Sequence, residues 1–483
     1  MQEFKDRTGL PGPRSSSSQI FPEGRDNYPV TDVSWYEAEA YAAFRGKQLP
    51  NIFQWEKAGR NGTVGALSNY MPWGVFYPGD TLDQRANFRN EGTWPVDSGE
   101  FGMSPFGAYN MSGNVSEWCL NETSEGFLAT GGGWGEPVYT FANYGAFPGF
   151  YSSDKRGFRC ALTTGGDQGN ATIKINEQVP VYTRTSDQDF AKWTRFYDYE
   201  KTPLNPQVEK QETPEWTRER ITYDGADGER AIAYLYLPKN FPRPLQVIHF
   251  VPPGDVENGQ RSATQATEDS LGSQIKSGRA VFVVITKGYI ERLNPEGYVE
   301  PDPTKAEYRD KVVNRITDLR RGLDYLETRN DIDPRKIAFC GVSSGARVGL
   351  IQAAIERRYA AVVFVGSGIR QAYSNFIAEA NIINFASHIR GPIMLIHGKY
   401  DENLSLKREA EPLYKILPEP KQMVTYDGGH VAPLELMVRT MNGFLDQTMS
   451  SETRVGVESM RSQDAVISLN ERLLDYCSAA HPT

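Results

Sequence analysis

The sequence predicts two folds in succession, a loop-rich α+β domain followed by a mostly parallel α/β domain. Residues 1–165 are rich in Gly, Asn and aromatic residues and contain few long periodic runs. From residue 219 onward, short β-branched runs alternate with amphipathic helical patterns. Apolar strands that alternate with helices are typical of a parallel sheet covered on both faces. A hydrophobic content of 39% is sufficient for globular cores.

The front domain, residues 1–165, contains one clear helical pattern, SWYEAEAYAAFRGK. Ser34 is placed to cap this helix, and Glu37, three residues further on, completes a capping box. The following pieces are short and broken by proline and glycine, among them YMPWGVFYPGD, SPFGAYNMSGN and LATGGGWGEP. These pieces predict a domain dominated by loops.

A connector and the rear domain follow. Residues 166–218 are polar, charged and marked by proline, which predicts a connector. The rear domain, residues 219–449, contains seven apolar runs that predict strands: AIAYLYL, LQVIHFV, AVFVVIT, KIAFCGV, AAVVFVG, PIMLIHG and MVTYDGG. Between them, residues 312–326 carry apolar side chains four and three apart, as on one face of a helix. Residues 450–483 form a tail to which no role is assigned.

Charge and composition exclude several classes of function. The net charge of −9 is spread along the chain without a basic run, so we expect no nucleic-acid partner. No segment approaches eighteen uninterrupted apolar residues, so no membrane association is expected. The N-terminus lacks the apolar stretch of a signal peptide, and the four cysteines do not form a disulfide framework. The expected location is a reducing compartment, by default the cytoplasm.

The stretch AFCGVSSGARVGL, residues 338–350, lies where a predicted strand passes into a predicted helix. Gly341–Gly345 matches the pattern G-x-S-x-G, in which a tight turn forces the central serine outward at the carboxyl end of the sheet. Ser343 occupies that position and is the predicted nucleophile. Ser344 follows the serine position of the pattern by one residue, and its backbone N–H is predicted to be an oxyanion donor. The alternative is an ordinary glycine-rich turn.

A serine nucleophile needs a base that takes its proton. The chain has five histidines: His249, His388, His397, His430 and His481. His430 follows a predicted strand in TYDGGHVAP, on a Gly-Gly loop that can bring the ring over the turn, and it is the predicted base. The others precede the turn, lie in a predicted helix or strand, or belong to the tail. For His397, in the strand PIMLIHG, we expect a satisfied core histidine.

The acid is expected after the next-to-last strand, where IMLIHGKYDENL places Asp401. The order Ser343, Asp401, His430 is that of a hydrolase triad built on this kind of turn. Asp427 and Glu402 remain alternative acids.

The second oxyanion donor is expected in the loop VPPGDVENG, which follows the strand LQVIHFV. Pro252 and Pro253 have no N–H and cannot donate. Gly254 and Asp255 are the candidates, with Gly254 preferred.

Residues 186–448 resemble the α/β-hydrolase superfamily and, more narrowly, the hydrolase module attached to sulfatase-modifying-factor domains. The resemblance rests on TPLNPQVE, ERITYDGADGERAIAYLYLPKN, SGRAVFVVITKGYIER, DYLETRNDIDPRKIAFCGVSSGA, HGKYDENL and DGGHV. It implies an α/β hydrolase fold and a serine carboxylesterase that acts on small-molecule carboxylic esters of short to medium acyl chain through an acyl-serine. No cofactor is implied for catalysis. Two departures are Ser344, where relatives often carry a bulky residue, and the proline-rich oxyanion loop.

Two alternatives to the esterase remain. The first is a prolyl-oligopeptidase-like serine peptidase, whose catalytic half is similar but which needs a propeller or a site for a free amino terminus. No propeller repeat is visible in the sequence. The second is a non-catalytic binding protein, which the intact triad disfavours for the rear domain.

Residues 28–162 resemble the formylglycine-generating-enzyme and sulfatase-modifying-factor fold, which is related to C-type lectins. The matching motifs are YPVTDVSWYEAEAYAAFRGKQLP, QWEKAGRNG, PWG, SPFGAYNMSGNVSEW, GGGW and RGFRCA. The start of the family domain is expected to be absent or reduced to residues 1–27. Copper-dependent members use two cysteines after the GG-x-[WY] segment, and iron-dependent relatives use histidines. The corresponding segment GGGWGEPVYTFANYG has no cysteine, and residues 1–248 have no histidine.

The front domain is therefore expected to be a scaffold or binding module, or an interface of a homo-oligomer, rather than an oxidase. Cys119 and Cys160 are expected to be buried. The resemblance also implies one structural calcium in NMSGNVSEW, with the ligands Asn110, Gly113, Val115 and Glu117. The alternative is that these side chains satisfy local backbone groups.

Overall fold

A computed structural model of the chain describes residues 2–9, 23–60, 70–75, 82, 84–88, 90–162, 178–225, 228–257, 261–294 and 298–449. The chain divides into two compact units, Met1–Glu177 and Gln178–Thr483, and each is considered by itself. The predicted tail, residues 450–483, lies outside the described residues, as does the first part of the predicted connector.

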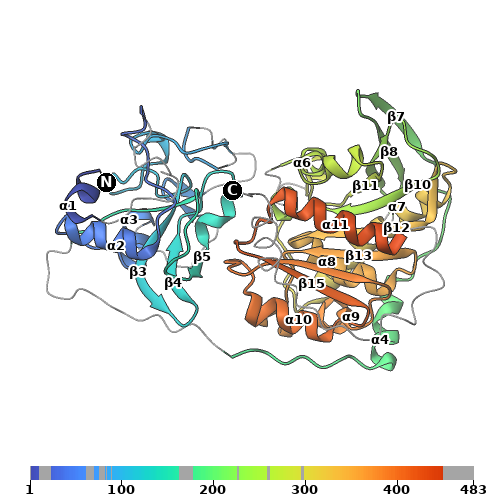
Figure 1. The fold of residues 1–483 in the computed structure, drawn as a ribbon. Helices are drawn as coiled ribbons and strands as arrows, with labels where there is room; N and C mark the ends of the chain where they lie inside the picture. The colour runs from blue at the N-terminus through green and yellow to red at the C-terminus, as the bar shows by residue number, and fades with distance from the viewer. Residues whose placement is uncertain are drawn as a thin grey trace, which may run out of the picture. The chain divides into compact units, whose positions relative to one another are not determined.

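The front unit combines short helices with two small sheets (Figure 1). Its helices are α1 (Gln2–Thr8), α2 (Trp35–Phe44) and α3 (Ile52–Arg60). Its four-stranded sheet has the order β5 (Tyr144–Phe147), β4 (Gly126–Thr130), β3 (Ser116–Thr123) and β6 (Arg156–Phe158), and a separate pair joins β1 (Tyr70–Met71) to β2 (Gly74–Val75). The predicted capping box is confirmed, because Ser34 Oγ accepts from Glu37 N and the Glu37 carboxylate accepts from Ser34 N.

Side chains satisfy much of the loop backbone in this unit, as the loop-rich sequence requires. Asn114 accepts the N–H of Trp94 at 2.8 Å and donates to the Trp94 carbonyl at 3.2 Å. Asn87 donates to the side chain of Asn114 and to the Gly92 carbonyl. A small core that includes Trp55, Met111 and Phe141 lies beneath these loops.

The rear unit is built around one nine-stranded sheet. In spatial order the strands are β15 (Lys421–Tyr426), β14 (Ile393–Gly398), β13 (Tyr359–Val365), β12 (Ile332–Val342), β10 (Leu245–Val251), β11 (Ala280–Ile285), β9 (Arg230–Pro238), β8 (Trp216–Asp224) and β7 (Gln207–Glu212). The six strands from β15 to β11 pair in parallel, and β9, β8 and β7 complete the sheet in antiparallel pairs. All seven predicted strands are present, and the predicted α/β hydrolase fold with its mostly parallel sheet is confirmed.

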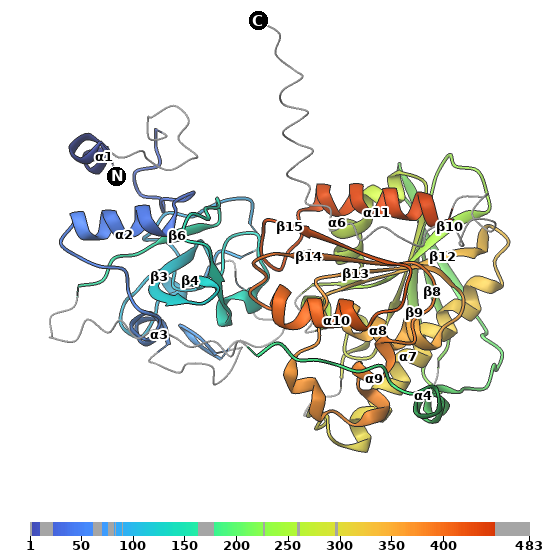
Figure 2. The same ribbon diagram turned by 60° about the horizontal axis from the view of Figure 1, so that its bottom comes forward.

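Helices cover both faces of this sheet (Figure 2). They are α4 (Asp187–Thr194), α5 (Gly254–Glu257), α6 (Ala263–Lys276), α7 (Ala306–Glu327), α8 (Ser344–Ile355), α9 (Ile383–Ala386), α10 (Glu411–Ile416) and α11 (Leu434–Met449). One face packs against α6 and α11, and the other against α7, α8, α9 and α10. Along β11, Phe282 belongs to the core beneath α7 and Val283 to the core beneath α6. Strands apolar on both sides are what such a sheet requires.

The predicted connector differs from the structure, which assigns residues 178–218 to the rear unit. Phe190 and Tyr197 are buried in its core, and β7 extends the sheet by pairing with β8. The sequence QVEKQE of β7 gave no strand signal because every side chain in this edge strand is exposed. Charge on an edge strand is expected, since it discourages pairing with other chains.

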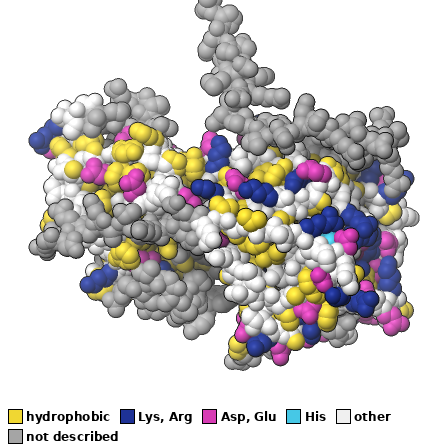
Figure 3. Space-filling model, turned by 90° about the horizontal axis from the view of Figure 1, so that it is seen from below, with side chains coloured by type: hydrophobic (Ala, Val, Ile, Leu, Met, Phe, Trp, Pro, Cys, Tyr) yellow, Lys and Arg dark blue, Asp and Glu magenta, His cyan; other side chains and the backbone are white. Residues whose placement is uncertain are grey.

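Opposite charges are interspersed over the rear unit on the face shown in Figure 3. In several pairs a buried aspartate is bonded to a partly buried arginine, such as Asp318 with Arg292 at 2.5 Å and Asp324 with Arg358 at 2.7 Å. These pairs connect a short 3-10 turn and the loop before β13 to helix α7. In the described part of the chain, no helix combines the length and the apolar character needed to cross a membrane.

Helix α7 offers a test of the core. Leu319 is fully buried beneath the sheet, whereas Leu293 is 64% exposed. Leu319→Ala should lower the free energy of unfolding of the rear unit by about 2–5 kcal/mol, because it removes buried methyl groups and leaves a cavity. Leu293→Ala should change it by less than about 0.5 kcal/mol. Urea unfolding followed by circular dichroism measures both, and equal effects would contradict the packing described.

Candidate active site

The turn between β12 and α8 holds Ser343 in a strained conformation. Its φ is 52° and its ψ is −112°, a region that side-chain-bearing residues rarely adopt. The flanking glycines make the turn possible, because a Cβ on Gly345 would lie 2.1 Å from the Val251 carbonyl oxygen. A Cβ on Gly341 would lie 2.6 Å from the Gly345 carbonyl oxygen. The G-x-S-x-G turn predicted from sequence therefore exists, with Ser343 at its apex.

The three residues predicted as a triad lie in one hydrogen-bonded chain. Ser343 Oγ is 2.8 Å from His430 Nε2, and His430 Nδ1 is 2.7 Å from Asp401 Oδ2. With a carboxylate on Nδ1, the neutral imidazole carries its proton there and leaves Nε2 free to accept the Ser343 hydroxyl proton. Asp401 and His430 are both buried. Neither of the alternative acids occupies the position of Asp401.

The alternative acids bind other groups nearby. The Asp427 carboxylate pairs with Lys399 at 2.9 Å. Glu402 Oε2 accepts the backbone N–H of His430 at 3.1 Å, so this carboxylate holds the loop rather than the imidazole. Both residues therefore help to place the His430 loop without taking the place of Asp401.

Asp401 is oriented by the loop that follows it. Its Oδ1 accepts the backbone N–H groups of Asn403 at 2.9 Å and Leu404 at 2.8 Å. Its Oδ2 lies 3.4 Å from Nε2 of His397, which donates to the Leu404 carbonyl at 2.8 Å. His397 was expected to be a satisfied core histidine. It is buried and bonded through Nε2, yet its Nδ1 has no partner among the described residues, and it contacts the acid of the site.

Close glycine packing brings the Asp401 and His430 loops together. A Cβ on Gly398 would lie 2.1 Å from the Gly429 carbonyl oxygen, directly before His430. A Cβ on Gly366, after β13, would lie 3.0 Å from His430 Cε1. The backbone at Gly366 thus lies against the imidazole and limits its freedom to turn, while the Gly398 contact holds the backbone directly before His430.

The charges of Asp401 and His430 stabilise each other. Burial opposes the imidazolium, but the charge and hydrogen bond of Asp401 outweigh it and hold the pKa of His430 above its ordinary value. Burial also opposes the carboxylate, yet His430 holds the pKa of Asp401 below its ordinary value. An imidazolium formed during proton transfer would therefore be stabilised in place.

The two predicted oxyanion residues lie side by side. A Cβ on Gly254 would be 3.5 Å from Ser344 Oγ, so the start of α5 lies against the start of α8. The first N–H groups of a helix have no partner within it, which leaves the Ser344 N–H available to an oxyanion. Ser344 Oγ itself is buried without a partner in the described parts of the chain.

The remaining histidines lie away from the triad. His249 in β10 is fully buried, bonds Tyr359 Oη through Nδ1 at 2.8 Å, and has its pKa lowered to about 3 by burial. His388 lies two residues after α9, stacks on Phe190 and contacts the Thr185 carbonyl at 3.0 Å. His481 lies outside the described residues.

Asn403 and Arg370 are site residues that the sequence analysis missed. Asn403 Nδ2 lies 3.3 Å from His430 Nε2, and Arg370 Nη2 donates to the carbonyl and to the side-chain oxygen of Asn403. The only available signal was the position of Asn403 two residues after the acid.

In the front unit, Cys119 is fully buried as expected, whereas Cys160 is only half-buried, which corrects the expectation for it. Cys160 lies two residues beyond the end of β6, in a stretch where Phe158 and Arg159 are also only half-buried. Burial raises the pKa of both thiols. No cluster of three or more His, Cys, Asp or Glu side chains suited to a metal occurs among the residues that the structure describes.

The predicted calcium ligands fit a cation only in part. Asn110 Oδ1 is buried and has no partner among the described residues, as a free ligand oxygen would. Both oxygens of Glu117 are occupied, by Arg159 at 2.5 and 2.7 Å and by Trp55 Nε1 at 2.7 Å. A cation at Glu117 would have to displace the Arg159 guanidinium. Calcium binding through Asn110, Gly113, Val115 and Glu117 stays a prediction.

Comparison with known proteins identifies the front unit. Residues 4–164 match the family model of the sulfatase-modifying factor enzyme 1-like domain. The front unit is a domain of this family.

The curated relatives of this chain include formylglycine-generating enzymes. The formylglycine-generating enzyme of Thermomonospora curvata is 38% identical over 134 residues, which cover 25% of this chain and 40% of that protein. The inactive C-alpha-formylglycine-generating enzyme 2 of Bos taurus is 32% identical over 164 residues, which cover 29% of this chain and 52% of that protein. The chain thus spans 40% of the first of these relatives and about half of the second.

Solved structures match about half of the chain. An acetyl xylan esterase from Paenibacillus sp. R4 covers 56% of this chain and 96% of its own, at 19% identity and a TM-score of 0.44. A glucuronoyl esterase from Solibacter usitatus covers 56% of this chain and 99% of its own, at 13% identity and a TM-score of 0.40.

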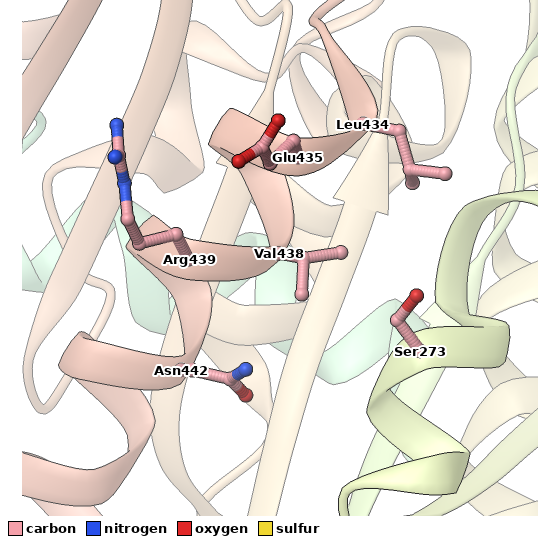
Figure 4. A pocket seen from close by; sticks show the side chains of 6 residues that line it. All are labelled: Ser273, Leu434, Glu435, Val438, Arg439 and Asn442. Atoms are coloured by element: carbon pink, nitrogen blue, oxygen red, sulfur yellow. The ribbon is translucent and has the colours of Figure 1, made fainter.

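A separate hollow of about 530 Å³ lies between α6 and α11 (Figure 4). It is lined by Ser273, Leu434, Glu435, Val438, Arg439 and Asn442. None of the triad residues lines it, so it is distinct from the site around Ser343.

The glycine contact beneath His430 yields a test with a matched control. Gly398→Ala should lower the free energy of unfolding of the rear unit by about 1–3 kcal/mol, because the new methyl group meets the Gly429 carbonyl. Gly443→Ala, in the interior of α11 with open space around it, should raise it by about 0.5–1 kcal/mol. Denaturant titration distinguishes the two signs, and a neutral Gly398→Ala would contradict the close contact.

Proposed function

We propose that the rear unit is a serine carboxylesterase that hydrolyses small-molecule carboxylic esters through an acyl-serine. The observation that carries the proposal is the hydrogen-bonded chain from Ser343 through His430 to Asp401, with distances of 2.8 and 2.7 Å. The strained φ of Ser343 supports it, since strain of this kind accompanies nucleophilic serines on such turns.

In the acylation step, Ser343 Oγ attacks the ester carbonyl carbon while its proton passes to His430 Nε2. Asp401 keeps the Nδ1–H of the ring oriented and stabilises the imidazolium. The backbone N–H groups of Ser344 and Gly254 would bind the oxyanion. When the tetrahedral intermediate collapses, the bond to the alcohol oxygen breaks, and the proton on Nε2 passes to that oxygen.

In the deacylation step, a water molecule occupies the place of the departed alcohol. His430 Nε2 takes a proton from the water as its oxygen attacks the acyl carbon. The bond from the acyl carbon to Ser343 Oγ breaks, the proton returns to Oγ, and the carboxylic acid leaves. The cycle consumes one water and needs no cofactor.

Esters of short to medium acyl chain are favoured as substrates by the sequence resemblance, because a triad by itself does not distinguish esters from amides. The prolyl-oligopeptidase alternative calls for a propeller, and the described front unit is instead built on a four-stranded and a two-stranded sheet. For the front unit we propose a scaffold or binding role, since its family's metal-binding cysteines and histidines are missing from this sequence.

Replacement of the two adjacent serines tests the nucleophile. Ser343→Ala should lower kcat/KM on p-nitrophenyl esters on the order of 10⁶-fold, to near background. Ser344→Ala should keep most of the activity, because Ser344 contributes its backbone N–H and its hydroxyl has no partner. A series of p-nitrophenyl esters from acetate to long chains measures both. If all three proteins behave alike, this turn is not the active centre.

The coupling of Asp401 to His430 predicts the acid limb of the pH profile. Activity requires neutral His430, so kcat/KM should fall as the pH drops through the pKa of this residue, which Asp401 holds above the ordinary histidine value. Asp401→Asn removes the charge that raises this pKa and should move the limb to lower pH, with a loss of about 10⁴-fold at the plateau. The matched variant Glu402→Gln should leave the plateau near wild type. An unmoved limb in Asp401→Asn would contradict the pairing.

A further inference from the structure

The side-chain amide of Asn403 lies beside the atom that exchanges protons in the proposed reaction. Its Nδ2 is 3.3 Å from His430 Nε2. A neutral imidazole with its proton on Nδ1 has a single lone pair, located on Nε2. The Ser343 hydroxyl, at 2.8 Å, is the closer donor and takes that lone pair. Among the residues that the structure describes, the Asn403 NH₂ group therefore has no acceptor of its own besides this shared lone pair.

Arg370 fixes which end of this amide faces the imidazole. Its Nη2 donates to the backbone carbonyl of Asn403 at 3.1 Å and to the side-chain oxygen of the same residue. The oxygen of the amide is thus committed to Arg370. The nitrogen, a donor with two N–H groups, must face His430, because a flipped amide would place two donors against each other.

A leaving-group oxygen must reach the same place. To receive the proton, it must come within about 2.6–3.2 Å of the donor nitrogen, here Nε2. A donor fixed 3.3 Å from Nε2 is within hydrogen-bonding reach of an oxygen that approaches Nε2 on the side of Asn403. Negative charge develops on this oxygen as its bond to carbon breaks, and a preoriented donor stabilises developing charge.

We propose that Asn403 is a catalytic residue whose side-chain N–H binds the leaving-group oxygen during acylation and the attacking water during deacylation. This inference rests on the proposed esterase function. As the carbon–oxygen bond breaks, its electron pair passes to the alcohol oxygen. Asn403 stabilises that charge until the proton arrives from His430 Nε2, and Arg370 is the positioning residue that holds the amide.

The competing explanation is purely structural. The backbone N–H of Asn403 also donates to Asp401, so a variant could disturb the acid without any contact to substrate. A structural role that disturbs Asp401 would also weaken His430 as the base for attack, so it would lower the rate on p-nitrophenyl butyrate as well and move the acid limb of the pH profile. A contact with the leaving-group oxygen predicts a loss that grows as the leaving group becomes more basic, because an alkoxide needs stabilisation far more than p-nitrophenolate does.

The test is a leaving-group series with a constant acyl group: the p-nitrophenyl, phenyl, trifluoroethyl and ethyl butyrates. The measured quantity is kcat/KM, which reports acylation, plotted on a logarithmic scale against leaving-group pKa. Asn403→Ala and Asn403→Asp should lose about 10- to 100-fold on ethyl butyrate and less than about threefold on p-nitrophenyl butyrate. Their slopes should be steeper than that of wild type. Asn403→Asp keeps the oxygen that Arg370 binds, so it separates loss of the donor from loss of that anchor.

Asn442→Ala is the matched control. Asn442, in α11, also accepts from an arginine through its side-chain oxygen, at 2.5 Å from Arg279 Nη1, but it does not contact the triad. Removal of the Asn442 side chain should leave the slope of log kcat/KM against leaving-group pKa unchanged, whatever its effect on stability. Arg370→Ala should steepen the slope less than Asn403→Ala does, because the amide is retained but is no longer held.

The outcomes separate the two hypotheses. Steeper slopes for both Asn403 variants, with a wild-type slope for Asn442→Ala, support the proposal. An active wild type with variant slopes equal to its own overturns the role of Asn403 and leaves the esterase intact, as does an Asn403→Asp variant indistinguishable from wild type. A wild type that hydrolyses none of the esters overturns the esterase function and this proposal together.

Discussion

The geometry of the site depends on one close contact, that of Gly345 with the backbone of Val251 at the end of β10. No side chain fits between them, since even a Cβ would lie 2.1 Å from the carbonyl oxygen. With the start of α8 held this close to the sheet, the chain can leave β12 only through a tight turn. Ser343 is the residue of that turn with strained backbone angles. It precedes the first residue of α8 and is not part of the helix.

The partners of Ser343 come from the ends of two neighbouring strands. Because β14 and β15 are parallel, the loops that follow them meet at one edge of the sheet, where Asp401 and His430 face each other. Glycines at the crossing let the two loops approach at backbone distance. The sheet thus provides a rigid edge, and the three short loops that follow its strands carry Ser343, Asp401 and His430.

Sequence reasoning found the strands and the triad because each had a local signal. The parallel strands are continuous apolar runs, and Ser343, Asp401 and His430 each follow one of them in a recognisable order. Strand β7 had no such signal, since its polar side chains are all exposed and its pairing with β8 is decided by tertiary structure. Asn403 and Arg370 were missed because an amide–guanidinium contact across 33 residues depends on how separate loops converge.

The segment Asp401–Glu402–Asn403 contacts the His430 loop through all three of its side chains: at the ring Nδ1, at the backbone N–H and beside the ring Nε2. These contacts cannot be lost one at a time by movement of the loop. Displacement of the segment would remove the acid, the backbone anchor and the amide in a single step. The site should therefore behave as a cooperative two-state unit, either fully assembled or fully disassembled, and partial loop motion should change the fraction of competent molecules rather than the rate of each one.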